Sequence, residues 1–216
     1  VQQLLTLPFG IGSFIMGGLY STTVVAGVHH MYTLIDVGQL GLYGKTYWLP
    51  LASAANIAQG AAALAVALKT RNQKTKSMAV PSAMSCFMGI TEPAIFGVNL
   101  RFFRPFICGA VGGACGALYT SIVGLGATGT GVTGIFGLLL CLNDPLNYII
   151  MFLISAGVAF VLTWMFGYKD ATEKVPEKKE PVKEIVEEEA AETECKEDIV
   201  YAPVEGTAIP YTEIKD

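Results

Sequence analysis

Acidic residues are nearly absent from the first 169 positions of this 216-residue chain. Only Asp36, Glu92 and Asp144 occur there, whereas 15 of the 18 acidic residues lie between Asp170 and Asp216. A carboxylate costs roughly 2.5–3.5 kcal/mol to place in hydrocarbon. Because the chain is also 52% hydrophobic, we expect the first part to lie in a lipid bilayer. Its net charge is +5 and that of the tail is −9, which indicates two environments.

Several common functional motifs are also missing. The five cysteines form no CxxC or zinc-type spacing, so the sequence predicts neither a metal site nor a disulfide framework. No Walker A motif occurs, which leaves ATP-driven transport unsupported. The run Gly129–Gly134 matches GxGxxG, but it lacks the preceding strand and the following acidic residue of a dinucleotide site. We therefore expect no cofactor, no metal and no nucleic-acid partner.

Four apolar stretches are long enough, or nearly so, to cross about 30 Å of hydrocarbon as a helix. They cover residues 4–28, 48–68, 105–125 and 146–168. Aromatic residues at two of their ends are typical of membrane interfaces, namely Tyr43, Tyr47, Trp48, Trp164, Phe166 and Tyr168. Glycines in the first and third stretches provide small faces for close helix packing, at positions 17, 18, 109, 112, 113 and 116.

Two other segments are apolar but interrupted by glycine, proline or threonine, residues 80–99 and 124–140. Such segments in transporters often form the binding site. Basic residues flank residues 80–99 on both sides, in Lys69–Lys76 and Arg101–Arg104. Lys- and Arg-rich short loops face the cytoplasm, so this segment should be a re-entrant hairpin. The fold class is then an all-α membrane protein with re-entrant hairpin segments. Provided that residues 124–140 also do not cross fully, the tail is cytoplasmic.

The composition changes sharply after the last apolar stretch. Residues 169–197 are rich in Glu and Lys and poor in apolar residues, which predicts a flexible acidic linker. Residues 198–216 contain short Val, Ile and Tyr runs separated by proline and glycine, which indicates two β-strands and a turn. This β-rich stub is too short to bury a core. Because the chain also begins at Val1 without an initiator methionine, we expect a fragment of a longer protein.

Glu92 is the strongest candidate for a functional residue. It precedes Pro93, and a residue before proline is biased away from helical conformation, so it should lie at the break of residues 80–99. Its carboxylate can accept hydrogen bonds from two sugar hydroxyls or a proton from a hydroxyl that is being phosphorylated. The alternative is a structural role, in which Glu92 pairs with Arg101 or a backbone N–H at the bend.

His29 and His30 end the first apolar stretch. An imidazole can donate and accept hydrogen bonds near neutral pH, which suits a polyhydroxylated ligand. Successive helical residues point about 100° apart, so we expect only one of them to face a cavity and no shared metal site. The alternative is a contact with lipid headgroups or a helix cap.

The other polar residues of the first part have simpler interpretations. Asp36 should be a solvated or capping residue, and Asp144 in Asn-Asp-Pro should form a turn. Asn56 and Gln59 lie within an apolar stretch, where interhelical hydrogen bonds are expected.

The run Gly89–Leu100, GITEPAIFGVNL, resembles the signature of the IIC transport domain of the phosphoenolpyruvate-dependent sugar phosphotransferase system, glucose superfamily. Residues 19–40, 47–60 and 124–137 are similar to its sucrose-specific branch, while trehalose and β-glucoside relatives share the plan. The resemblance covers residues 1–168, the expected C-terminal part of a IIC domain. Residues 202–210 resemble the opening of a IIA domain, so residues 198–216 are its expected start.

This resemblance implies a multi-pass, homodimeric permease of the bacterial cytoplasmic membrane. Such a permease binds a disaccharide, here most simply sucrose, and carries it to a IIB domain for phosphorylation. By the same resemblance, Glu92, Thr91 and His29 or His30 would contact the sugar. The IIB phosphocysteine and IIA phosphohistidine motifs are absent, so the phosphoryl carriers would lie outside these 216 residues. Two alternatives are an ion-coupled sugar transporter and a membrane sugar sensor that does not transport.

Overall fold

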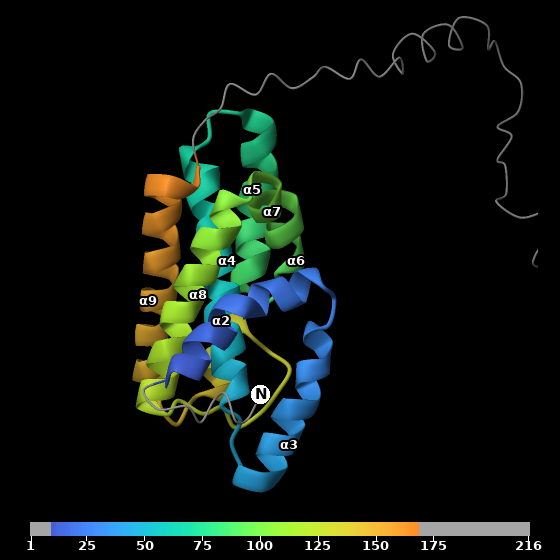
Figure 1. Cartoon of the computed structure of the whole chain (residues 1–216), viewed down its shortest axis with the longest axis vertical. Coiled ribbons are helices and arrows are strands. Elements are labelled where there is room, and N and C mark those ends of the chain that lie inside the picture. The colour runs from blue at the N-terminus through green and yellow to red at the C-terminus, as the bar shows by residue number, and fades with distance from the viewer. Residues whose placement is uncertain (1–9, 169–216) are drawn as a thin grey trace, which may run out of the picture. The chain divides into compact units, whose positions relative to one another are not determined.

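Helices account for most of residues 10–168, the part of the chain that the computed structural model describes (Figure 1). In chain order they are α2 (Ile11–Val25), η2 (His29–Tyr32), α3 (Thr33–Tyr43), α4 (Trp48–Lys69), α5 (Gln73–Phe87), α6 (Glu92–Ala94), η3 (Ile95–Asn99), α7 (Leu100–Phe102), α8 (Arg104–Val123), η4 (Gly134–Leu140), α9 (Pro145–Leu162) and η5 (Thr163–Gly167). Residues 10–168 contain no β-strand, only an isolated antiparallel bridge between Thr46 and Ala127. The expected all-α class is confirmed for this part, and the predicted linker and stub lie outside it.

The described part contains three helices that are long and apolar enough to cross a membrane: α4, α8 and the continuous α9–η5. They match the predicted spans 48–68, 105–125 and 146–168. The predicted span 4–28 corresponds to α2, which is shorter, with 15 residues; residues 1–9 are outside the described range.

Helix α4 forms the centre of the helical assembly and packs against α2, α5, α8 and α9. In the most apolar 18-residue stretch of α4, 89% of the residues are buried. The same share for the continuous α9–η5 is 22%. Alanine and glycine dominate α4, and their small side chains let neighbouring helices approach on every side. Helix α9 instead exposes large apolar residues such as Leu146, Leu153 and Val161, which suits a lipid-facing surface.

The predicted glycine faces are packing surfaces. A Cβ added to Gly112 would lie 2.6 Å from Cβ of Ala159, and one added to Gly116 would lie 2.9 Å from Cβ of Ala54. A Cβ on Gly17 would overlap Ala117. Helix α8 therefore contacts α2, α4 and α9 through positions where only glycine fits, as its sequence predicted.

Two of the predicted interface aromatics are buried instead. Trp48 is 1% exposed and Tyr168 is 5% exposed, whereas Tyr43, Tyr47, Trp164 and Phe166 lie on the surface. Trp48 begins the central helix α4 and turns inward, and Tyr168 shares a hydrogen bond with Thr70. The interface interpretation was wrong for these two, because an aromatic ring at a helix end can pack inside the protein as well as lie among lipid headgroups.

Residues 80–99 form the turn of a helical hairpin, as expected. Helix α5 leads into the turn, and α6, η3 and α7 lead back (Figure 1). The start of α5 and the end of α7 lie close together. Tyr168 contacts both: it shares a hydrogen bond with Thr70, just before α5, and its ring meets the ring of Phe102 in α7 edge-on, with centroids 5.0 Å apart. Pro81 lies inside α5 without ending it.

The hairpin reverses at Gly89, which has φ +104°, a conformation that only glycine adopts easily. Glu92 follows the reversal as the first residue of α6. The expectation that Pro93 keeps Glu92 out of a helix was wrong, because proline is well tolerated in the first turn, where the backbone N–H has no helical partner anyway. The expected position of Glu92 at the break is correct.

Residues 124–140 also leave and return at one end of the assembly, between the end of α8 and the start of α9 (Figure 1). This loop reaches the hairpin turn: a Cβ on Gly134 would overlap the carbonyl oxygen of Phe87, and one on Gly89 would lie 3.0 Å from the carbonyl oxygen of Thr133. The GxGxxG run Gly129–Gly134 is part of this loop, with no strand before it, so the rejection of a dinucleotide fold is supported.

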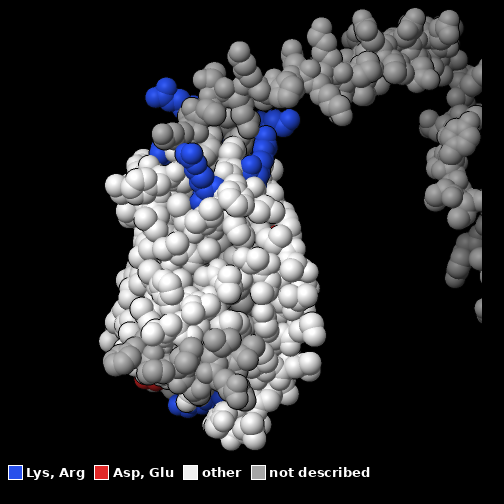
Figure 2. Space-filling model, in the orientation of Figure 1, with Lys and Arg blue, Asp and Glu red and all other residues white. Residues whose placement is uncertain are grey.

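Lysine and arginine gather at the end of the assembly where the hairpin opens (Figure 2). Lys69 ends α4, Lys74 and Lys76 lie in the first turns of α5, and Arg101 and Arg104 flank the α7–α8 junction. The described chain ends beside them at Tyr168, through its contacts with Thr70 and Phe102. The two basic clusters predicted from the sequence therefore share one end.

Candidate functional site

A cavity of about 330 Å³ lies between the hairpin turn, the segment η2–α3, the start of α4 and the loop 124–140. Ligand sites in proteins are typically about 300–1,000 Å³. All four residues predicted for the site, His29, His30, Thr91 and Glu92, line this cavity. They come from two segments that are about 60 positions apart in the sequence and that the fold brings together.

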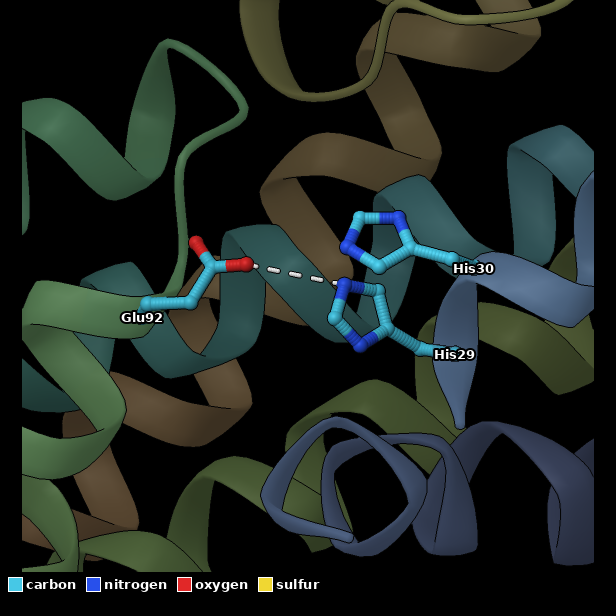
Figure 3. A group of neighbouring side chains, drawn as sticks. All are labelled: His29, His30 and Glu92. Carbon is cyan, nitrogen blue, oxygen red and sulfur yellow. Dashed lines mark ion pairs between the residues drawn. The ribbon is translucent and has the colours of Figure 1, made fainter. Parts of the chain in front are cut away.

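The side chains of Glu92 and His29 point toward one another (Figure 3). The distance from Nε2 of His29 to Oε1 of Glu92 is 3.5 Å, with the two side chains 15% and 45% exposed. A tight charge-assisted N–H···O bond is about 2.7–2.9 Å. The pair is thus close enough for one ligand hydroxyl to accept from the imidazole and donate to the carboxylate.

The two histidines lie together rather than apart. Their ring centroids are 4.0 Å apart, with an angle of 38° between the planes, and both line the cavity. The expectation that only one would face it was wrong, since both side chains of the short turn η2 line the cavity.

Burial lowers the pKa of His29 below its ordinary value of 6.5; His30 lowers it further, and the nearby Glu92 opposes the shift. His29 is therefore neutral at physiological pH, with one ring nitrogen as donor and one as acceptor. Nδ1 of His29 is buried without a hydrogen-bond partner among the described residues. A neutral imidazole beside a carboxylate offers one donor and several acceptors to a hydroxyl-rich ligand.

Thr91 is 4% exposed, so it can offer only a small part of its surface to a ligand. Across the cavity, Nδ2 of Asn56 donates to Oγ1 of Thr133 at 3.0 Å. This bond links α4 to the loop 124–140. The expected interhelical role of Asn56 is confirmed in part, since its partner lies on a loop that packs against the hairpin.

Asp36 was expected to be solvated or to cap a helix. It is not solvated, because it is 6% exposed and lines the cavity, but it accepts a hydrogen bond from the backbone of Leu49 in the first turn of α4, which is a capping contact. Oγ1 of Thr46 donates to Oδ1 of Asp36 at 2.5 Å. Burial raises the pKa of Asp36, while hydrogen bonds from Thr46 and from the backbone of Leu49 lower it. The chain folds back at Gly44, which has φ +68°, and this reversal covers the carboxylate with α4.

Aromatic rings form the apolar wall of the cavity, and sequence reasoning did not identify them as site residues. Tyr32 and Trp48 have ring centroids 4.5 Å apart, and Tyr20 lies 6.2 Å from Trp48. Trp48 and Tyr20 are buried, so the partly exposed ring of Tyr32 is the one available to the apolar face of a sugar ring. The only available signal was the position of Trp48 at the start of a span, which is equally typical of a lipid interface.

Taken together, the cavity offers the carboxylates of Glu92 and Asp36, two imidazoles, amide and hydroxyl groups, and aromatic walls. This mixture of hydrogen-bond acceptors and donors suits a neutral ligand with several hydroxyl groups. Asp144, by contrast, lies at the start of α9, where Asn-Asp-Pro forms the expected turn, and is not part of the cavity.

Comparison with known proteins agrees with this chemistry. Residues 3–113 match the family model "Phosphotransferase system, EIIC". The chain is 42% identical over 166 residues to a PTS system sucrose-specific EIIBC component of Salmonella typhimurium, covering 76% of this chain and 36% of that protein. It is 40% identical over 172 residues to a sucrose-specific EIIBC component of Bacillus subtilis, with the same coverage. A trehalose-specific component of that organism is 40% identical over 129 residues, 59% of this chain and 27% of the relative.

The chain thus spans about a third of the length of these two curated sucrose-specific relatives. No solved structure matches it. The family match covers more than half of the chain and includes His29, His30, Thr91 and Glu92. This chain therefore belongs to the EIIC family of the phosphotransferase system.

Proposed function

We propose that this chain is the sugar-binding part of a permease that takes up a disaccharide, sucrose, by group translocation. In this proposal, Glu92, His29, His30 and Thr91 hold the sugar. The observation that carries it is the pairing of Glu92 with the two histidines in one polar cavity with aromatic walls. The names of the relatives support sucrose as the substrate. They do not favour an ion-coupled transporter or a sensor.

Glu92 has a second role in this proposal. Transfer of a phosphoryl group from a phosphocysteine of a IIB domain breaks a P–S bond and forms a P–O bond to the sugar. The sugar hydroxyl loses its proton in this step, and a carboxylate that already accepts a hydrogen bond from that hydroxyl can take it. The 45% exposure of Glu92 leaves room for a second domain to approach. The IIB and IIA domains that supply the phosphoryl group are partners outside this chain, and we propose a homodimer for the full-length protein.

We further propose that the assembly lies in the bacterial cytoplasmic membrane with its basic end in the cytoplasm. Residues 80–99 are then a re-entrant hairpin that opens to the cytoplasm, and residues 124–140 re-enter from the opposite side. Positive charges concentrated at one end support this orientation. A fluorescent or phosphatase reporter fused after Tyr168 tests it: an active cytoplasmic reporter is expected, and periplasmic phosphatase activity would exclude the orientation.

The main test is the substitution Glu92→Gln in the full-length protein. Membrane vesicles supplied with the general phosphotransferase proteins should convert external sucrose into internal sucrose phosphate. Loss of the charged acceptor should lower this rate roughly 10- to 100-fold, since a hydrogen bond to a charged group is worth about 1.5–3 kcal/mol.

Asp144→Asn is the matched control, because it removes a carboxylate outside the cavity, and it should leave the rate unchanged. Wild-type uptake by Glu92→Gln would refute the role of Glu92. Accumulation of free sucrose that an uncoupler abolishes would refute group translocation.

A further inference from the structure

His29, His30 and Glu92 form a cluster of three metal-ligating side chains. Each offers one ligand atom, and these atoms all lie within 4.8 Å of one another. Figure 3 shows both imidazoles beside the carboxylate, with the histidines on one segment and Glu92 on another. Because η2 and α6 are held by separate parts of the fold, the cluster exists only in the folded protein.

Two imidazoles and one carboxylate make up the ligand set that holds Zn²⁺ in sites with an open fourth position. With Zn–N and Zn–O bonds of about 2.0–2.2 Å, neighbouring ligand atoms of a tetrahedral site lie roughly 3.3 Å apart. The 3.5 Å between Nε2 of His29 and Oε1 of Glu92 is close to this spacing. His30 is exposed, so its ring can turn toward the same point at little cost.

We propose that these three side chains bind a borderline-soft divalent cation such as Zn²⁺, and that the cation and the sugar compete for them. The metal site stands on the geometry of the cluster alone. The competition rests on the proposed function, because it requires the sugar to use the same three groups.

The surroundings of the cluster favour a reversible inhibitor over a resident cofactor. Nδ1 of His29 has no partner among the described residues, whereas a metal-bound histidine normally donates its other N–H to an oxygen. Loss of such a partner typically costs 10–100-fold in metal affinity. Mg²⁺ and Ca²⁺ require sets of oxygen ligands, which one carboxylate beside two imidazoles does not provide. The site should therefore select Zn²⁺ and its neighbours in the transition series.

The experiment is a calorimetric titration of Zn²⁺ into the 216-residue chain, purified in detergent without a histidine tag. The chain has two histidines in all, so histidine-dependent binding reports on this cluster alone. We expect His29→Gln, His30→Gln and Glu92→Gln each to weaken Zn²⁺ binding at least about tenfold, and Asp144→Asn to leave it unchanged. Mg²⁺ should give no binding signal. Equal thermal unfolding midpoints would show that each variant is folded.

Co²⁺ provides a second readout, because its visible bands report nitrogen and oxygen ligands and a near-ultraviolet charge-transfer band reports thiolates. The proposed site predicts visible bands that vanish in the double variant His29→Gln/His30→Gln. Unchanged Zn²⁺ affinity in that variant, or a thiolate band alone, would assign the metal to cysteines and overturn the site.

Sucrose should raise the apparent dissociation constant of Zn²⁺ in proportion to its concentration, and unchanged Zn²⁺ affinity at saturating sucrose would overturn the competition. Histidine-dependent Zn²⁺ binding by a chain that binds no sugar would confirm the metal site and refute the proposed function.

Discussion

Asn99 donates a hydrogen bond to Oε1 of Gln59 at 2.7 Å, and both side chains are completely buried. The same amide also donates to the backbone oxygen of Gln59 at 2.8 Å. Gln59 in turn donates to Ser21 of α2 and to the carbonyl oxygen of Phe106 in α8. One amide in the middle of α4 thus joins the returning arm of the hairpin to two other helices, as expected for a polar residue within a span.

We expect Asn99→Asp to destabilise the protein, because it replaces the donor with an acceptor that faces two oxygens of Gln59. Leaving a buried group without its partner costs about 1–3 kcal/mol, and more when a charge is involved. The thermal unfolding midpoint in detergent should fall by several degrees. Asn147→Asp is the control, since Asn147 is only partly buried and accepts through its oxygen from Tyr119. Equal midpoints for the two variants would contradict the assigned role of Asn99.

The contact between the loop 124–140 and the hairpin turn predicts that Gly134→Ala is strongly destabilising. Gly134 has φ +71°, and an added Cβ would overlap the carbonyl oxygen of Phe87. Gly124 is the matched control, because it has φ +70° but nothing within 4 Å of an added Cβ. Gly124→Ala should cost only the strain of the left-handed conformation, about 1–2 kcal/mol. Sucrose binding and the unfolding midpoint should fall more in Gly134→Ala, and equal effects would rule out the backbone contact as the cause.

Asp36 predicts a pH-dependent difference in stability between wild type and Asp36→Asn. Because burial raises the pKa of Asp36 above its ordinary 3.8, the folded state binds a proton more readily than the unfolded state. The contribution of Asp36 to stability is therefore present below that ordinary value and is lost as pH rises through the folded-state pKa.

Asparagine keeps an acceptor for the Thr46 hydroxyl without the charge, so Asp36→Asn should gain on the wild type as pH rises and then stay level. Unfolding midpoints measured between about pH 4 and pH 8 test this. A difference that does not change with pH would show that the carboxyl group is not responsible. Asp36→Ala loses the hydrogen bond and should be less stable than Asp36→Asn at neutral pH.

The two histidines should contribute unequally to sugar binding. The side chain of His29 is 15% exposed and lies 3.5 Å from Glu92, whereas His30 is exposed at the edge of the cavity. His29→Gln should weaken sucrose binding about 10- to 100-fold, or roughly 1.4–2.8 kcal/mol, and His30→Gln less than about tenfold. Equilibrium binding of labelled sucrose to each variant decides the order. A larger loss in His30→Gln would mean that the sugar lies nearer the mouth of the cavity.

The residue pattern alone was sufficient to predict the parts of the fold that depend on whether a segment lies in lipid or in water. Long apolar runs predict α4, α8 and α9, because a helix makes all its backbone hydrogen bonds within the segment, as a hydrocarbon environment requires. Glu92 stood out for the same reason, as one of three acidic residues in an apolar region. The glycines of α8 were predicted as packing positions because small residues allow close helix contacts.

Contacts between distant segments could not be read in this way. Nothing local shows that His29 and His30 lie together beside Glu92, that Trp48 turns inward, or that Asp36 is buried against Thr46. Each depends on where the chain reverses, at Gly44 and Gly89, and on which helix then covers the side chain. The sequence by itself determined a membrane-type helical domain with a carboxylate and two histidines as its candidate site. Only the tertiary structure decided that these three groups share one cavity, because their proximity comes from packing between segments about 60 residues apart.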